Sequence, residues 1–404
     1  MTTAELSVDQ AIAELIATLQ PVEGIERVPT SAALARILAE DIASPLDLPA
    51  FDNAAMDGYA LRAADLALPA LQEIGTALAG HAFAGRVEAG TCVRIMTGAP
   101  LPAGADTVVM VEDTVREDGR VRIVHPPAAG ANVRRRAEHL ARGDVVLPSQ
   151  RQLRASDLGL AAAIGCSELP VMRRLRVGLL STGDELADPP APLTTGAAYD
   201  ANRPFLRASV ERSGFTAIDL GICPDRSAEF ERVLARVLAD RLDAVVISGG
   251  AAQGDADIVR RAGGVRFVAL NIRPGRGIAV ANLTQSDHAM TLLGLPGNAV
   301  AAFVMFHLVA RPVLLHLAGG IAAVPPSLPV PLAGPVHVRG GRIDYRRACF
   351  VRDSRGALTV APLKDQGSAM LRTVVEADAL IAVGPQSDYA AGEPVETIPL
   401  ALLD

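Results

Sequence analysis

Short apolar runs alternate with amphipathic stretches through the middle of the chain. The clearest run is Ala244–Ile247, in which three of the four residues are β-branched, followed at once by Ser248-Gly249-Gly250. A run this short that ends in glycines is typical of a strand buried on both faces of a parallel sheet. Similar runs alternate with helical patterns, which predicts a parallel sheet wrapped by helices. The predicted strands are Val177–Leu180, Thr216–Leu220, Ala244–Ile247, Val265–Leu270 and Met290–Leu293, and the predicted helices are Phe205–Ser213, Glu229–Leu238, Asp257–Ala262 and a long one after Pro296.

The flanking segments carry other patterns. Ser7–Gln10 has the form of a capping box in front of an amphipathic helix, and a second short helix is predicted over Ala32–Ala39. Short strands punctuated by Gly and Pro predict a small β-rich unit, with a helix after it, and a Pro- and Ala-rich linker precedes a small all-β domain. These elements are strands Val93–Met96, Thr107–Val111 and Val121–Val124, helix Ser156–Ile164, linker Ile321–Pro331, and strands Val336–Arg339, Arg346–Val351, Leu358–Pro362 and Ala379–Val383.

The most apolar stretch of the chain is Ala299–Leu317. His307, Arg311 and Pro312 interrupt it, so we expect a buried helix that ends or kinks near the proline rather than a membrane span. The first ten residues carry acids and no apolar core, so no signal peptide is expected.

Composition excludes several classes of protein. The 404 residues are 50% hydrophobic but only 3% aromatic, so the cores must be aliphatic and base-stacking surfaces are not expected. A net charge of −7 argues against a general nucleic-acid binder. The four cysteines form no Cys-x-x-Cys pair, which favours reduced thiols in a cytoplasmic protein and gives no sequence case for zinc.

Acids and hydroxyls follow two of the predicted strands. Asp184 and Glu185 come after the first strand, and Asp255 and Asp257 after the strand that ends in Ser248. If both strands are parallel and close together, these acids meet at one edge of the sheet. Together with the hydroxyls of Ser181, Thr182 and Ser248 they suit Mg²⁺, which takes a few carboxylates and shares phosphate oxygens. The alternative is that the acids only satisfy helix dipoles.

Three basic or glycine-rich stretches suit an anion. Arg273-Pro274-Gly275-Arg276-Gly277 offers two guanidinium groups to a phosphate or another tetrahedral oxyanion, although a solvated turn explains it equally well. Gly294–Asn298, with Pro296 and Gly297, opens the long helix and predicts free N–H groups, or else a plain turn capped by Asn298. Arg134–Arg136 is either a solvated face or a source of charge for a phosphate-rich ligand.

Taken together, these stretches resemble the MoeA family of molybdenum-cofactor enzymes, which includes the gephyrin E domain. The resemblance covers nearly the whole chain, and the matching stretches have the order and spacing of the family. They are Asn53–Ala60 (family form N-S-A-M-D-G-Y-A), Ile95–Asp106, Ser181–Leu186, Ser248–Asp257, Arg273–Gly277 and Gly294–Asn298.

The resemblance implies a multidomain α/β plus β architecture and a homodimer. A MogA-like α/β domain with a parallel-type sheet binds molybdopterin, an elongated N-terminal helical and β region precedes it, and a small β domain follows. The implied boundaries are 1–50 with 147–174 for a linking domain, 51–146 for an inserted β-rich domain, 175–322 for the α/β domain and 323–404 for the C-terminal domain. The active cleft would be shared between the α/β domain and the N-terminal region of the partner subunit.

The resemblance also implies a reaction: insertion of molybdate into adenylylated molybdopterin, with Mg²⁺-dependent release of AMP. Two N-terminal residues and three acids match the catalytic set, and the three acids are also the expected metal ligands. The catalytic set is Asp57, Thr97, Glu185, Asp225 and Asp257, of which Glu185, Asp225 and Asp257 would hold the metal. The expected binding residues are Ser181, Thr182, Gly183, Asp184, Ser248, Gly249, Gly250, Arg273, Arg276, Pro296, Gly297 and Asn298.

Three departures from the family pattern leave an alternative open. Ala252 replaces a serine after the Gly-Gly turn, His139 replaces an acid, and Ala299 replaces a second proline. They are compatible with a non-catalytic paralogue that binds molybdopterin or serves as a scaffold. Candidate partners are molybdopterin adenylyltransferase and downstream cofactor-handling proteins; neither nucleic acid nor membrane is expected.

Overall fold

The computed structural model describes residues 5–249, 259, 264–285, 287–386 and 388–403. The chain divides into two compact units, each described here by itself. One holds residues 40–149 and 156–167, and the other holds the rest of the chain, including the α/β and C-terminal β domains. The predicted helix Asp257–Ala262 falls almost wholly outside the described residues, and the division into four domains stays a prediction.

A six-stranded sheet organises the larger unit. Its order is β16-β13-β17-β21-β20-β18, and the first four strands are parallel, as predicted. β20 runs antiparallel to both of its neighbours and lies in a stretch for which the sequence predicted no strand. The bounds are β13 (Arg176–Thr182), β16 (Thr216–Cys223), β17 (Ala244–Ser248), β18 (Arg266–Ala269), β20 (Gly277–Gln285) and β21 (His288–Leu295).

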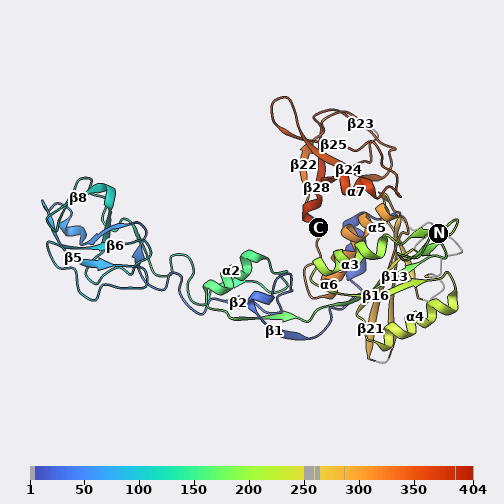
Figure 1. The fold of residues 1–404 in the computed structure, drawn as a ribbon, viewed down its shortest axis with the longest axis horizontal. Helices are drawn as coiled ribbons and strands as arrows, with labels where there is room; N and C mark the ends of the chain where they lie inside the picture. Colours follow the sequence, from blue (N-terminus) through green and yellow to red (C-terminus); the bar gives the residue numbers. More distant parts are fainter. Residues whose placement is uncertain (1–4, 250–258, 260–263, 286, 387, 404) are drawn as a thin grey trace. The chain divides into compact units, whose positions relative to one another are not determined.

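Helices cover both faces of this sheet (Figure 1). Every residue of β17 is buried, because alternate side chains pack into two different cores. Val246 belongs to the core that contains α1 (Val8–Ile16), α3 (Asn202–Arg212), α5 (Ala299–Met305) and α6 (Arg311–Leu317). Val245 and Ile247 belong to the core beneath α4 (Ser227–Ala239). The predicted capping box at Ser7 is formed with Gln10.

The long apolar helix is continuous but irregular. A π-helical turn, η5 (Phe306–Ala310), separates α5 from α6 and comes just before Pro312, which has no N–H to donate to the preceding turn. The helix predicted to end or kink near the proline thus continues through it, with a π-helical turn just before it. By length and composition Ala299–Leu317 could cross a membrane, but 89% of its apolar window is buried inside the structure, as expected for a core helix.

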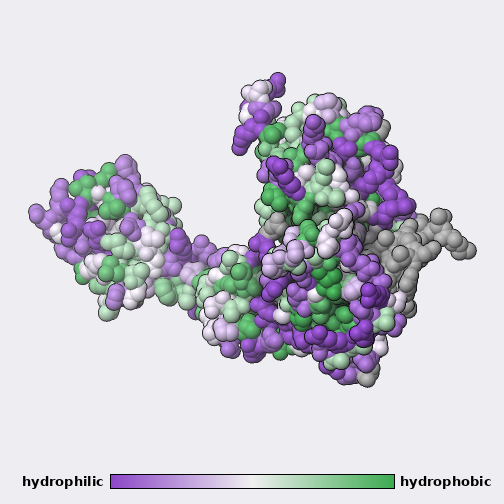
Figure 2. Space-filling model, turned by 45° about the vertical axis from the view of Figure 1, so that its right-hand side comes forward, coloured by the Kyte–Doolittle hydropathy of each residue, from purple (hydrophilic) through white to green (hydrophobic). Residues whose placement is uncertain are grey.

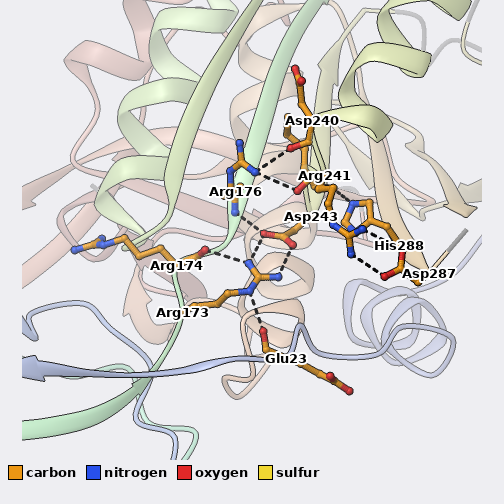
Figure 3. Close-up of polar contacts among 10 residues, drawn as sticks. Glu23, Arg173, Arg174, Arg176, Asp240, Arg241, Asp243, Asp287 and His288 are labelled. Carbon is orange, nitrogen blue, oxygen red and sulfur yellow. Dashed lines mark hydrogen bonds and ion pairs between the residues drawn. The ribbon is translucent and has the colours of Figure 1, made fainter. Parts of the chain in front are cut away.

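Opposite the carboxyl ends of the strands, a polar cluster ties their amino ends together (Figure 3). Asp243, directly before β17, is almost fully buried and accepts two hydrogen bonds of 2.7 and 2.8 Å from the Arg173 guanidinium. It also accepts one of 2.8 Å from the backbone N–H of Arg176, the first residue of β13. Arg241 pairs with Asp287 in the β20–β21 turn. These charge-assisted bonds hold the starts of three strands level.

The C-terminal domain is a second six-stranded sheet joined to the α/β domain by backbone pairing. Its order is β19-β24-β26-β28-β22 with β25 beside β24, and β19 comes from the α/β domain. Part of the predicted linker is strand, because Leu328–Pro331 pairs with β28. The bounds are β19 (Ile272–Arg273), β22 (Leu328–Pro331), β23 (Val336–His337), β24 (Ile343–Arg352), β25 (Leu358–Pro362), α7 (Arg372–Glu376), β26 (Ala379–Val383), β27 (Asp388–Tyr389), β28 (Pro394–Pro399) and η6 (Leu400–Leu402).

The N-terminal segment differs from the prediction at one place. Between residues 30 and 39 only η1 (Thr30–Ala32) is helical, so the helix predicted over Ala32–Ala39 is wrong. Ile37 and Leu38 instead form bridges with Gln152 and Val171, because partners distant in sequence offer their backbone groups. Alongside, β1 (Ile25–Pro29) pairs with β12 (Glu168–Met172).

The smaller unit is β-rich, as predicted. Its main sheet has the order β7-β4-β6-β5-β9-β8, and the predicted strands at residues 93, 107 and 121 are confirmed as β6, β7 and β9. The bounds are β2 (Ile42–Ala43), β3 (Asn53–Ala54), β4 (Gly58–Leu61), η2 (Ala63–Asp65), β5 (Leu71–Ala77), β6 (Thr91–Ile95), β7 (Thr107–Met110), η3 (Val111–Asp113), β8 (Thr114–Glu117), β9 (Arg120–Ile123), β10 (Val133–Arg134), β11 (Val145–Leu147) and α2 (Ala155–Ala163).

The surface mixes both kinds of residue. Figure 2 shows hydrophobic patches set among hydrophilic residues on the face in view. Among the described residues, the large hydrophobic side chains that are most exposed include Val375 and Ile321, at 83% and 64%. Single exposed side chains of this kind are ordinary.

His307 is an unusual member of the core. Its ring is fully buried in the π-helical turn, with the rings of Phe303, Phe306 and Phe205 centred 4.6, 5.2 and 6.3 Å away. Among the described residues neither of its nitrogens has a hydrogen-bond partner. Burial and the nearby Arg311 charge lower the pKa of His307 to about 3. The folded protein therefore holds this histidine neutral.

We expect His307→Leu to stabilise the fold, because it removes two unpaired polar atoms with little change of volume. In the parent the unfolded chain takes up a proton at His307 near pH 6.5 and the folded chain does so only near pH 3. The free energy of unfolding is therefore highest above pH 6.5 and falls by roughly 5 kcal/mol as the pH drops from 6.5 to 3. Urea denaturation at several pH values should show that His307→Leu loses less free energy of unfolding than the parent as the pH falls. The control is His337→Leu, which changes an exposed histidine. An unchanged pH dependence would contradict this account.

Candidate functional site

A cleft of about 1160 Å³ opens at the carboxyl ends of the parallel strands. All of its described lining residues belong to the α/β domain or the C-terminal β domain. Of the residues predicted from sequence, eleven line it: Thr182, Gly183, Glu185, Asp225, Ser248, Gly249, Arg273, Arg276, Pro296, Gly297 and Asn298. Gly250 and Asp257 lie outside the described residues, and Ser181 and Asp184 are not among the lining residues.

The order of the strands separates acidic from basic side chains along this edge of the sheet. Asp225 follows β16 and Glu185 follows β13, so the acids lie at one end. Ser248 ends β17, and Pro296 follows β21, in the middle. Arg276 directly precedes β20, and because β20 is antiparallel its first residue lies at the same edge as the last residues of the parallel strands. The arginines therefore lie at the other end from the acids.

The acids are close enough to influence one another. Asp184 accepts a hydrogen bond of 3.2 Å from the backbone N–H of Asp225. Partial desolvation, and then the charges of Asp184 and Glu185, raise the pKa of Asp225. Among the described residues no group of three or more His, Cys, Asp or Glu side chains is arranged to hold a metal ion.

Buried polar atoms lie at the carboxyl ends of the strands, where the cleft opens. The hydroxyls of Ser181 and Thr182 are buried and have no hydrogen-bond partner in the described part of the chain. Ser248 accepts a hydrogen bond of 2.6 Å from the side-chain amide of Asn202, which also donates to the Gly297 carbonyl at 2.7 Å. Asn202 thus ties the ends of β17 and β21 together. No sequence motif predicted a role for Asn202. It is the first residue of α3, and its N–H donates to the carboxylate of Asp200, two residues earlier.

Two backbone amides beside the cleft are already in use. The N–H of Gly249 donates to the Leu295 carbonyl at 3.2 Å, and that of Val300 in the first turn of α5 donates to the Ser368 carbonyl at 3.1 Å. These two N–H groups are therefore satisfied by neighbouring backbone rather than free for an anion. The side chain of Asn298 makes no cap hydrogen bond in the described structure.

The loop that carries Ser368 is held by a buried arginine. Arg347 is 1% exposed and donates to Thr373 Oγ1 at 3.0 Å and to the Gly367 carbonyl at 3.1 Å. Gln366 adds hydrogen bonds to both backbone groups of Arg347. Gln366, Ser368 and Ala369 line the cleft, so the C-terminal domain forms part of its wall.

Within the described part of the chain, three arginines line the cleft. Arg273 donates to the carbonyls of Arg339 and Gly340 in the C-terminal domain, so part of its donor capacity is already used. Arg276 pairs with Glu5 at 3.4 Å. Arg342 also pairs with Glu5. Neither residue was predicted from sequence, because both lie outside the glycine-rich turns. Arg273 and Arg276, whose guanidinium groups were predicted to suit an anion, thus both line the cleft, and Arg342 lines it with them.

Comparison with known proteins places the chain. Family models match three consecutive regions: the MoeA N-terminal region (domains I and II) over residues 6–165, a probable molybdopterin-binding domain over residues 178–316, and the MoeA C-terminal region (domain IV) over residues 329–400. A molybdopterin molybdenumtransferase of Haemophilus influenzae is 35% identical over 402 residues, covering 98% of each chain. The chain belongs to the MoeA family.

Other relatives agree with this assignment. Molybdopterin molybdenumtransferase 2 of Mycobacterium tuberculosis is 33% identical, over 96% of this chain and 97% of its own. The crystal structure of a molybdopterin biosynthesis MoeA protein from Pyrococcus horikoshii OT3 matches with a TM-score of 0.81 at 26% identity, covering 98% of this chain and all of that one. The multidomain fold is therefore that of MoeA proteins.

The remaining predicted site residues of this MoeA protein lie in the smaller unit. Asp57 accepts hydrogen bonds from the Thr97 backbone N–H at 2.7 Å and from the Thr97 hydroxyl at 2.8 Å, both at Oδ1. These bonds lower the pKa of Asp57. Two residues far apart in sequence thus form one exposed carboxylate–hydroxyl pair. In the nearby basic run, Arg135 pairs with Asp52 and Arg136 with Asp47, so these charges are met locally.

We expect Gly249→Ala to damage the cleft. Gly249 has φ +90°, and a Cβ there would lie 2.5 Å from the Thr182 carbonyl oxygen and 2.8 Å from Thr182 Oγ1. The turn must shift, and we expect the free energy of unfolding to fall by roughly 2–4 kcal/mol, measured by calorimetry as a lower Tm. Gly356→Ala is the matched control, because φ is +81° and a Cβ would meet nothing within 4 Å, leaving only backbone strain of about 1–2 kcal/mol. Equal losses in the two variants would contradict the close contact.

Proposed function

We propose that this MoeA protein inserts molybdate into adenylylated molybdopterin with Mg²⁺-dependent release of AMP. Its family makes it a transferase of molybdenum cofactor biosynthesis. The observation that carries the proposal is the division of charge along one sheet edge, with Glu185 and Asp225 at one end of the cleft and Arg273, Arg276 and Arg342 at the other. A substrate with a phosphoanhydride needs a cation, which the acidic end can hold, and the oxyanion to be transferred needs the positive charge of the basic end.

The acidic end fits Mg²⁺. Glu185 and Asp225 both line the cleft. Burial, and then the charges of Asp184 and Glu185, raise the pKa of Asp225, and a bound cation would relieve the repulsion between these charges. The unpaired Thr182 hydroxyl lies beside them and is a further oxygen donor. Bound Mg²⁺ would neutralise charge on the phosphates. Asp257 completes this set in the proposal.

The basic end fits an oxyanion. Arginine forks donate pairs of parallel hydrogen bonds, which suits a tetrahedral oxyanion such as molybdate. Arg276 and Arg342 line the cleft from two different domains, and the turn Pro296–Asn298 lines it as well. In this reading the chain contributes positioning and electrostatic stabilisation, because no covalent bond to a side chain is required.

The purified chain should release AMP from adenylylated molybdopterin when molybdate and Mg²⁺ are present. Glu185→Gln keeps the shape and removes one charge, so we expect kcat/KM to fall by about 10²-fold or more and the Mg²⁺ requirement to rise. Because Glu185 helps to raise the pKa of Asp225, its loss should also move the acidic limb of Mg²⁺ binding to lower pH.

Glu229→Gln is the matched control, since Glu229 lies on α4 and pairs with Arg226 and Arg232 rather than lining the cleft. Tight binding of the pterin without any AMP release by the parent chain would refute the catalytic proposal. That result would favour a molybdopterin-binding or scaffolding role.

We also propose that the working enzyme is a homodimer in which Asp57 and Thr97 of one copy complete the cleft of the other. Asp57→Asn and Glu185→Gln should each be nearly inactive alone. If the two variants are unfolded, mixed and refolded, half of the random dimers are mixed and each regains one intact cleft, so about a quarter of the parent activity should return.

Mixing Asp57→Asn with Thr97→Ala is the control, because both changes fall on the same side of a shared cleft and no activity should return. A site contained within one chain predicts no recovery from either mixture. The predicted cytoplasmic location, the adenylyltransferase and downstream cofactor-handling partners, and the absence of nucleic-acid and membrane partners stay predictions.

A further inference from the structure

A carboxylate from the start of the chain lies among the cationic groups of the cleft. Glu5 Oε2 accepts a hydrogen bond of 3.0 Å from Arg342 Nε, and Glu5 Oε1 accepts bonds from Arg342 Nη2 and, at 3.4 Å, from Arg276 Nη2. Arg342 and Arg276 line the cleft from the C-terminal and α/β domains respectively. One acid therefore engages two of the three guanidinium groups expected to meet an oxyanion.

The backbone around Glu5 is tied to the rim of the cleft. Leu6 forms a parallel bridge with Leu270, in which its N–H donates to the Ala269 carbonyl at 2.9 Å and its carbonyl accepts from Asn271 at 2.8 Å. Asn271 in turn accepts from the N–H of Ile343, the residue after Arg342. The next residue, Ser7, caps α1. These contacts fix the start of the Glu5 side chain relative to both arginines.

We propose that Glu5 sets the affinity of the cleft for tetrahedral oxyanions by holding Arg276 and Arg342 until an anion displaces it. This inference rests on the proposed function, because it assigns the oxyanion to the basic end of the cleft. A carboxylate in contact with two guanidinium groups cancels part of their field and occupies donors that the anion needs. A dianion that can accept from both arginines competes well, whereas a monoanion competes poorly.

Glu5→Gln tests this role, because the amide keeps the shape and removes the charge. Molybdate alone, titrated by calorimetry into the parent and variant chains at low ionic strength, should bind roughly 3–10-fold more tightly to Glu5→Gln. The gain should shrink as salt is added, since the pair is partly exposed. The affinity for perchlorate, a tetrahedral monoanion, should rise by a larger factor than the affinity for molybdate. The preference of the cleft for the dianion over the monoanion should therefore be smaller in Glu5→Gln.

Glu14→Gln is the matched control. Glu14 lies on α1 and pairs with Arg266, which is not among the described lining residues of the cleft, so molybdate affinity should not change. In an Arg342→Gln background the effect of Glu5→Gln should be reduced, because the carboxylate then has only Arg276 to neutralise.

Unchanged or weaker molybdate binding in Glu5→Gln would overturn the inference and assign Glu5 a purely structural role. So would an absence of binding in both chains. The proposed function is judged separately by AMP release from the parent chain. If the parent chain releases AMP but Glu5→Gln binds molybdate no more tightly than the parent, only the inference about Glu5 is wrong. If Glu5→Gln binds molybdate more tightly but the parent chain releases no AMP, only the catalytic proposal is wrong.

Discussion

The parallel pairing of β17 between β13 and β21 is the constraint on which the site depends. Ser248 lies opposite Ser181 on one side and Leu295 on the other, so three strands end level at one edge. The turns that follow them must then occupy one small region, and a Cβ on Gly297 would be in ordinary van der Waals contact with the Gly249 Cα, at 3.6 Å. Apolar burial on both faces of β17 is the main force behind this register, since a slip by one residue would exchange the side chains that pack into the two cores.

The two edges of the sheet have opposite characters. At the amino edge, the buried Asp243 carboxylate is satisfied by Arg173 and by the backbone of Arg176, so charge there serves stability. At the carboxyl edge, Ser181 and Thr182 keep buried hydroxyls without partners in the described chain, and like charges crowd around Asp225. Polar groups left unsatisfied inside a fold are costly, which is why such sites are candidates for ligands.

The C-terminal domain belongs to the cleft as well as to the fold. The pairing of β19 with β24 continues the α/β chain into the second sheet, and it places Arg342 beside the loop that carries Arg273 and Arg276. The Ser368 carbonyl then takes the Val300 N–H at the start of the long helix. This backbone amide is therefore used within the protein, whereas the side chains of Arg273, Arg276 and Arg342 line the cleft.

Sequence alone determined the alternation of strands and helices, the parallel order around Ala244–Ile247, the capping box at Ser7, and most of the residues that meet in the cleft. These follow from periodicity, glycine turns and family motifs, which are local in the chain. Tertiary structure decided what depends on distant partners. The residues predicted to continue a helix to Ala39 form bridges instead, because backbone from residues 152 and 171 is available to them. The antiparallel β20 brings Arg276 to the edge where the acids lie, and the long-range contacts of Asn202, Arg342 and Glu5 complete the site. No local pattern encodes these contacts, since each requires two segments that only the folded chain brings together.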